Sequence, residues 1–174
     1  MKPGDHPEFF LRPAPDGASR ESQLRLDRDG RFWHEGALVE RPSLEFALHR
    51  WLRRHPTDGR PILSNGYDWC YVEVEDTTSF VQSVRPPSTP SDPPTLLLRD
   101  GSEEPLDPSA VLVDDDGVFY ARLDGDRGEA RFGRHAQTEL GAYLADEEPA
   151  RLIVGGRAYP LGRRTPASEA QAET

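Results

Sequence analysis

Two stretches of the chain, residues 42–55 and 131–145, place apolar residues at the spacing of an α-helix. In the first stretch the apolar positions are Leu44, Ala47, Leu48, Trp51 and Leu52. In the second stretch they are Phe132, Ala136, Leu140, Tyr143 and Leu144. Residues separated by three, four or seven positions lie along the same side of a helix. We therefore predict one amphipathic helix in each stretch.

The first predicted helix carries signals at both of its ends. Pro42 stands near its start, where a missing backbone N–H costs least, and Pro56 follows its end. Basic residues gather in its last turns, namely Arg50, Arg53, Arg54 and His55. Because the C-terminus of a helix carries partial negative charge, we interpret these basic side chains as compensation for the helix dipole.

A short pattern ahead of each predicted helix indicates a β-hairpin. Residues 26–34 and 113–121 share the order apolar, Asp, any residue, Asp, Gly, any residue, Phe, aromatic. An aspartate at the start and a glycine three residues later suit a type I turn that ends in a left-handed glycine. We expect Asp27 and Asp114 to accept hydrogen bonds from the backbone amides of their turns.

Short apolar or alternating runs elsewhere in the chain predict further strands. These runs are residues 61–63, 69–74, 78–84, 95–98, 151–154 and 157–161. The pair Gly155-Gly156 between the last two runs is a strong hairpin signal. The predicted fold class is α+β, with antiparallel β-strands and two main helices.

The two halves of the chain repeat the same order of hairpin, helix and hairpin. Aligning Leu52 with Leu144 also aligns Leu48 with Leu140 in the apolar stripes of the two helices. This correspondence predicts an internal duplication, in which two β-rich repeat motifs pack together.

Proline-rich and polar segments divide the chain into five parts. They are a Pro/Gly-rich arm at 1–22, a first repeat at 23–84, a Pro-rich linker at 85–94, a second repeat at 95–161 and a disordered tail at 162–174. Phe9 and Phe10 are apolar exceptions in the arm. They either tuck against the body of the fold or bind a partner, and we expect the first.

The charge balance excludes several classes of partner. The 174 residues include 21 Lys and Arg against 31 Asp and Glu, which gives a net charge of −10. Phosphate backbones and anionic membranes attract clustered cations, so we expect neither a nucleic-acid nor a membrane partner. A single cysteine, Cys70, excludes an intramolecular disulfide and a cysteine-based metal cluster. With no long apolar run and no signal peptide, we expect a cytoplasmic protein of the bacterial type.

Searches for chemical motifs identify no catalytic residue, metal ligand or cofactor site. The chain has no phosphate-binding glycine loop, no G-x-S-x-G and no H-E-x-x-H. Neither acidic turn fits the calcium loop of an EF-hand when its glycine is placed at the sixth position. An irregular divalent site remains an alternative to a solvated acidic surface for five aspartates, namely Asp114, Asp115, Asp116, Asp124 and Asp126.

Aromatic and charged residues concentrate in the first half of the chain. Alternation along residues 71–75 places Tyr71, Glu73 and Glu75 on one face of a strand. A ligand- or partner-binding surface is therefore predicted from Trp33, His34, Arg41, Trp69, Tyr71, Glu75 and Asp76. The alternatives are that the aromatic residues pack in the core and that the acidic residues form the solvated outer face of a strand.

The chain resembles a known family in several of these motifs. The hairpin at 26–36, the helix ending in Trp51-Leu52-Arg53-Arg54, and Val74-Glu75-Asp76 followed by Phe80 are similar to the DUF1285 family of bacterial proteins. The Asp-x-x-Gly hairpin, Asp76 and residues 117–120 also resemble, more distantly, the UPF0598 proteins of eukaryotes. The resemblance covers residues 23–161. It implies a fold of repeated β-rich motifs with helices and a role in signalling, and it transfers no catalytic residue.

Two hypotheses of function follow. The first is a non-enzymatic module that binds a protein or a small molecule through the predicted surface in the first half. The alternative is an enzyme with a small-molecule site between the repeats, assembled from His34, His135, Glu75, Asp76 and Arg41. A self-associating structural subunit is a third possibility.

Overall fold

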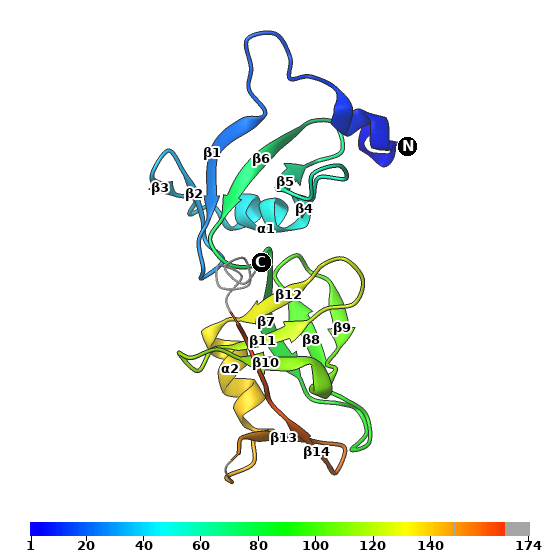
Figure 1. Cartoon of the computed structure of the whole chain (residues 1–174), viewed down its shortest axis with the longest axis vertical. Coiled ribbons are helices and arrows are strands. Elements are labelled where there is room, and N and C mark those ends of the chain that lie inside the picture. The colour runs from blue at the N-terminus through cyan, green and yellow to red at the C-terminus, as the bar shows by residue number, and fades with distance from the viewer. Residues whose placement is uncertain (148, 166–174) are drawn as a thin grey trace, which may run out of the picture. The chain divides into compact units, whose positions relative to one another are not determined.

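The computed structural model describes residues 1–147 and 149–165, and these fall into two compact units (Figure 1). The first unit is Met1–Thr78, and the second begins at Ser79. Each unit combines one α-helix with a mixed β-sheet, so the fold class is α+β as predicted. The boundary lies before the Pro-rich segment 85–94, which connects two neighbouring strands within the second unit.

The first unit is a six-stranded sheet with one helix. Its elements are η1 (Pro3–Asp5), η2 (Pro7–Leu11), β1 (Glu21–Leu26), β2 (Phe32–His34), β3 (Ala37–Leu38), α1 (Pro42–Trp51), β4 (Leu52–Arg54), β5 (Pro61–Ser64) and β6 (Trp69–Val74). The strand order is β3-β2-β1-β6-β5-β4. The neighbours β1 and β6 run parallel, whereas the other pairs are antiparallel.

Helix α1 begins at the predicted residue but ends four residues earlier than expected. Leu52 adopts an extended backbone, and residues 52–54 pair with β5 as strand β4. The partner strand therefore supplies hydrogen bonds that a continued helix would have made internally. Leu48 and His49 are buried, with the His49 ring 5.0 Å from that of Phe32. Leu44, predicted to lie on the buried stripe, is 40% exposed.

The N-terminal arm covers part of the sheet face that carries Ile62 and Trp69. Phe9 and Phe10 are buried in a cluster with Ile62 and Trp69. Nε2 of His55 lies 3.2 Å from the carbonyl oxygen of Phe10. The expectation that these phenylalanines tuck against the body of the fold is confirmed.

The second unit contains a seven-stranded sheet and a separate two-stranded sheet. Its elements are β7 (Ser79–Arg85), β8 (Thr95–Leu98), β9 (Glu103–Pro105), η3 (Pro108–Ala110), β10 (Val111–Val113), β11 (Phe119–Arg122), β12 (Glu129–Phe132), α2 (Arg134–Gly141), β13 (Arg151–Val154), β14 (Arg157–Pro160) and β15 (Gly162–Arg163). The order of the large sheet is β15-β10-β11-β12-β7-β8-β9, and β13 pairs with β14. The β10–β15 and β12–β7 pairs are parallel, so both large sheets are mixed rather than wholly antiparallel.

Helix α2 packs on the second sheet through the predicted apolar stripe. Phe132, Ala136 and Leu140 are almost completely buried, and they belong to the main core cluster of this unit. The helix is shorter than the predicted 131–145, because residues up to Phe132 pair as β12. Glu139 of α2 accepts hydrogen bonds from the Val84 backbone N–H at 2.6 Å and from a neighbouring serine hydroxyl.

The two Asp-x-x-Gly turns are built in the same way. Oδ1 of Asp27 accepts the backbone N–H groups two and four residues later, at 3.0 and 2.9 Å. Oδ1 of Asp114 accepts the equivalent pair at 3.0 and 2.8 Å. In each turn Oδ2 accepts from the aromatic residue six positions on, Trp33 or Tyr120. The expected role of both aspartates is confirmed, and the duplication of the whole repeat stays a prediction.

The segments expected to be a linker and a tail take part in the second unit. The Pro-rich segment 85–94 joins the antiparallel pair β7 and β8. A Cβ atom added to Gly155 would lie 3.1 Å from the Ser91 carbonyl oxygen, so the β13–β14 turn rests against this segment. Gly162 and Arg163, at the start of the expected disordered tail, form β15 beside β10. Residues 166–174 lie outside the described residues.

Candidate functional site

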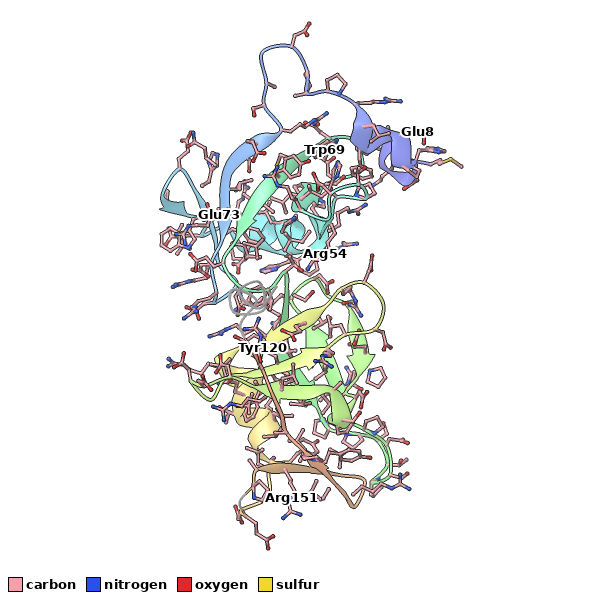
Figure 2. The ribbon with its side chains drawn as sticks, in the orientation of Figure 1. Glu8, Arg54, Trp69, Glu73, Tyr120 and Arg151 are labelled. Carbon is pink, nitrogen blue, oxygen red and sulfur yellow. The ribbon has the colours of Figure 1, made fainter. Side chains whose placement is uncertain are left out.

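The predicted binding residues all belong to the first unit, where strand β6 supplies the central ones (Figure 2). Side chains alternate along a strand, so Trp69, Tyr71 and Glu73 share one face of the sheet. Across β5, Ser64 pairs with Trp69 and Ile62 pairs with Tyr71. The predicted alternation holds for Tyr71 and Glu73, whereas Glu75 lies beyond the end of β6.

Trp69 is buried under the N-terminal arm. It is 6% exposed, and its ring centroid lies 6.1 Å from that of Phe10 and 5.0 Å from that of His55. The guanidinium of Arg20 lies 4.4 Å from the same ring. Trp69 is therefore a core residue that holds the arm in place and cannot contribute to an exposed surface.

Tyr71 is held by a charged network at the edge of this cluster. Its hydroxyl donates to Oδ2 of Asp58 at 2.7 Å, and this hydrogen bond raises the pKa of Tyr71 and lowers the pKa of Asp58. The Arg60 guanidinium lies 3.7 Å from the Tyr71 ring centroid and binds both carboxylate oxygens of Glu21, at 2.8 and 2.9 Å. The hydrogen bond to Arg60 lowers the pKa of Glu21. Tyr71 is therefore a neutral hydrogen-bond donor with its partners already in place.

Trp33 and Glu75 are brought together through Arg25. The Arg25 guanidinium lies 5.4 Å from the Trp33 ring centroid and forms an ion pair with Glu75. Oε2 of Glu75 also accepts the Arg28 backbone N–H at 3.1 Å. The indole N–H of Trp33 donates to Asp27 at 2.8 Å. Trp33 and Glu75 therefore already use part of their hydrogen-bonding and ion-pairing capacity within the protein.

The other three predicted residues are His34, Arg41 and Asp76. His34 and Arg41 are exposed, and the Arg41 carbonyl oxygen accepts the first N–H groups of α1. Asp76 is half-buried after the end of β6. Within the described ranges, neither His34 nor Arg41 makes a hydrogen bond or ion pair to Glu75 or Asp76. The cation beside Glu75 is therefore Arg25, rather than the predicted Arg41 or His34.

A pocket of about 530 Å³ lies elsewhere in the first unit, where the sequence predicted none. Its walls come from the second half of α1, from β4, from the turn after β5 and from the N-terminal segment. Three cationic side chains line it, namely Lys2, Arg50 and Arg53. We call it the cationic pocket. Phe46 and Trp51 add aromatic surface to the same wall.

The cations of this pocket have no carboxylate partner among residues 1–147 and 149–165. Arg50 lies over the Phe46 ring at 5.8 Å, and Nζ of Lys2 lies 3.5 Å from the Asn65 carbonyl oxygen. Asp5 lines the same pocket, where its Oδ2 accepts the Lys2 backbone N–H at 2.7 Å. One carboxylate therefore faces three cations.

Two glycines bring Lys2 to the pocket. The Gly4 N–H donates to the Gly66 carbonyl oxygen at 2.8 Å, and a Cβ atom on Gly4 would lie only 2.8 Å from the Gly66 Cα. Gly66 has a φ of +89°, and a Cβ atom there would lie 2.7 Å from Cδ of Lys2. Glycine at both positions allows the two backbones to approach, which places Lys2 beside the turn.

This pocket could not be predicted from the sequence, because its walls come from segments that are far apart along the chain. Arg50 and Arg53 were visible as part of a basic group and were assigned to the helix dipole. Their spacing of three residues was the available signal. Lys2 could not be placed with them, since the approach of Gly4 to Gly66 depends on tertiary structure.

Within residues 1–147 and 149–165, no group of three or more His, Cys, Asp or Glu side chains is arranged to hold a metal ion. The same part of the chain has no helix with the length and apolar character required to span a membrane.

Comparison with known proteins identifies two similar solved structures. A DUF1285 family protein from Silicibacter pomeroyi DSS-3 has a TM-score of 0.62 and 18% identity, covering 92% of this chain and 87% of that one. A DUF1285 family protein from Shewanella baltica OS155 has a TM-score of 0.51 and 18% identity, covering 67% of this chain and 87% of that one. No protein-family model and no curated protein matches the chain. The similarity to the DUF1285 family expected from the sequence is confirmed at the level of structure, and the chain has the fold of these DUF1285 family proteins.

Proposed function

We propose that the chain is a non-enzymatic binding module whose first unit binds a small anionic ligand in the cationic pocket. The observation that carries this proposal is the unbalanced charge of the pocket. Lys2, Arg50 and Arg53 face one carboxylate, Asp5, in a chain whose net charge is −10. Like charges that converge on a cavity repel one another, and an anion in the cavity relieves that repulsion.

Other arginines of the same unit provide the contrast. Arg20, Arg31 and Arg60 are each paired with a carboxylate at 2.7 to 2.9 Å. Arg50 and Arg53 have no such pair within the described part of the chain, although acidic residues outnumber basic ones. Arg50 lies in the last turn of α1 and is favoured by the helix dipole, whereas Arg53 lies in β4. In both residues the guanidinium hydrogen-bond donors are available to a ligand.

The size and lining of the pocket indicate the class of ligand. A volume of about 530 Å³ lies in the range of small-molecule sites. Guanidinium groups bind phosphate and carboxylate groups through paired N–H donors, and the lysine adds a point charge. Phe46 and Trp51 offer apolar contact to the rest of the ligand. The lining includes neither histidine nor cysteine beside its one serine, Ser64, which favours binding over group transfer.

Isothermal titration calorimetry with inorganic pyrophosphate tests this proposal. Titrations of the full chain are made at constant ionic strength, with sodium chloride as the reference salt. We expect saturable binding that weakens about tenfold in Arg53→Gln, the loss of one charge-assisted hydrogen bond being worth about 1.4 kcal/mol or more.

The matched control is Arg54→Gln, which removes the same charge from the next residue of β4, outside the pocket lining. We expect pyrophosphate affinity close to that of the unchanged chain. Equal weakening in both variants would show a general effect of surface charge, and the absence of saturable binding would remove the basis of the proposal.

A further inference from the structure

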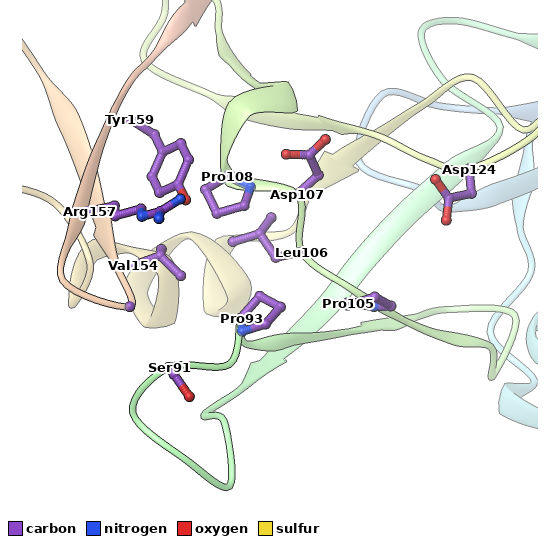
Figure 3. A pocket seen from close by; sticks show the side chains of 11 residues that line it. Ser91, Pro93, Pro105, Leu106, Asp107, Pro108, Asp124, Val154, Arg157 and Tyr159 are labelled. Atoms are coloured by element: carbon purple, nitrogen blue, oxygen red, sulfur yellow. The ribbon is translucent and has the colours of Figure 1, made fainter.

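The second unit contains a pocket of its own, with a volume of about 540 Å³ (Figure 3). It lies between the β13–β14 hairpin, the end of the Pro-rich segment and residues 105–108. This pocket is in a different unit from the cationic pocket, so the ligand of one is independent of the ligand of the other.

The floor of this pocket is apolar and well supported. Leu106 and Val154 are 1% and 7% exposed, and Pro108 is also buried. Pro93 continues the same surface (Figure 3). Proline rings and buried aliphatic side chains change shape little, so the floor offers a preformed apolar surface to a ligand.

A hydrogen-bonding pair stands along one wall. Arg157 and Tyr159 are two residues apart on β14 and therefore point to the same face of the strand. Figure 3 shows the Tyr159 ring beside Pro108, with Arg157 at the same side of the pocket. Neither the guanidinium nor the hydroxyl has a hydrogen-bond partner within the described residues. Together they present N–H and O–H donors suited to a carboxylate.

Two carboxylates, Asp107 and Asp124, also line the pocket. Figure 3 places Asp124 at the side opposite Arg157, with Asp107 between them. Oδ1 of Asp107 accepts the Ser109 N–H and hydroxyl, at 2.9 and 2.6 Å, which leaves Oδ2 toward solvent. A purely anionic ligand would be repelled by the two aspartates, and a purely cationic one would leave Arg157 without a partner. The charges are complementary to a ligand that carries both signs.

We propose that this pocket binds a short apolar peptide with free ends. Its C-terminal carboxylate binds Arg157 and Tyr159, its side chains pack on Leu106, Pro108 and Val154, and its terminal ammonium faces the aspartates. Arg157 is the residue that selects for a free carboxylate.

The test uses the tripeptide Leu-Ala-Leu, titrated calorimetrically into the full chain. The same peptide is also measured with an amidated C-terminus and with an acetylated N-terminus. We expect saturable binding of the free peptide, at least tenfold weaker binding of the amidated form, and severalfold weaker binding of the acetylated form. Amidation removes the charged partner of Arg157, and acetylation removes the charge that faces the aspartates.

The variant Arg157→Gln should bind the free peptide about as weakly as the unchanged chain binds the amidated one. The matched control is Arg122→Gln, which removes an exposed arginine of the same unit that lies outside the pocket lining. Circular dichroism verifies that both variants are folded. Equal binding of the free and amidated peptides, unchanged affinity in Arg157→Gln, or no saturable binding at millimolar peptide would each overturn the proposal.

Discussion

Replacing Asp27 by alanine tests the physical account of the first unit, because this carboxylate organises the first turn. Asp27 is 5% exposed, and four donors bind it. Oδ1 accepts the Asp29 and Arg31 backbone N–H groups at 3.0 and 2.9 Å. Oδ2 accepts Nε of Arg31 at 2.9 Å and the indole N–H of Trp33 at 2.8 Å.

The expected loss follows from how well each donor can be hydrated in the variant. A hydrogen bond to a charged group contributes about 1.5–3 kcal/mol, and a donor that stays near water recovers much of that when its partner is removed. Arg31 is exposed, whereas the indole N–H of the half-buried Trp33 loses its partner in a partly closed site. We therefore expect Asp27→Ala to lower the free energy of unfolding by about 3 kcal/mol, with two of the four bonds counted in full.

Urea denaturation followed by tryptophan fluorescence measures this loss. All three tryptophans, at positions 33, 51 and 69, belong to the first unit, so their fluorescence reports on that unit alone. With a urea dependence of about 1–3 kcal/mol per molar, the midpoint should fall by about 1–3 M. Asp29→Ala is the control, because Asp29 is exposed in the same turn. Equal midpoints for the two variants would refute the hydrogen-bonding account of the turn.

Four further outcomes are expected. Burial is the largest single influence on the pKa of Asp27 and raises it. The hydrogen bonds from Trp33 and Arg31 together outweigh burial, so the pKa lies below its usual value of about 3.9. The unfolded chain therefore binds more protons in acid than the folded chain does. This stabilisation is complete above about pH 5 and is lost as the pH falls through the folded pKa. In Asp27→Asn the urea midpoint should therefore depend less on pH between about pH 6 and pH 2 than it does in the unchanged chain. Glu139→Gln should lower the stability of the second unit by about 1–3 kcal/mol, measured by urea denaturation with circular dichroism, because the carboxylate caps a β7 N–H at 2.6 Å. Gly4→Ala should free the N-terminal segment, seen as faster amide exchange in residues 2–11, because its Cβ would collide with the Gly66 backbone. Burial raises the pKa of the Cys70 thiol, so a disulfide reagent should modify it more slowly than a free cysteine at pH 8.

Local features of the fold could be predicted because their causes lie within a few residues. The Asp27 and Asp114 turns depend on donors at most six positions away, and the structure reproduces them. The start of α1 at Pro42 is equally local. Its end was placed wrongly, because Leu52–Arg54 pair with a strand that follows in the sequence. Parallel pairing of β1 with β6 was missed for the same reason, since the alternation of a strand does not reveal its neighbours.

The candidate surface was predictable only in part. Alternation placed Tyr71 on the face that also carries Trp69, but it could not show that the N-terminal arm covers Trp69. The cationic pocket needs Lys2 beside Arg53, and that neighbourhood is created by tertiary contacts between glycines. The alternative of an enzyme with a site assembled from both repeats stays a prediction.

The central claim is that an anion binds among Lys2, Arg50 and Arg53, and side-chain NMR tests it most directly. Nitrogen–proton correlation spectra resolve the Nε–H signals of arginines, and variants at single positions assign them. Titration with inorganic pyrophosphate at constant ionic strength should shift the Arg50 and Arg53 signals along one saturable curve, while the Arg54 and Arg28 signals stay unchanged. Shifts of equal size at all exposed arginines, or no saturable shift at Arg50 and Arg53, would contradict the account.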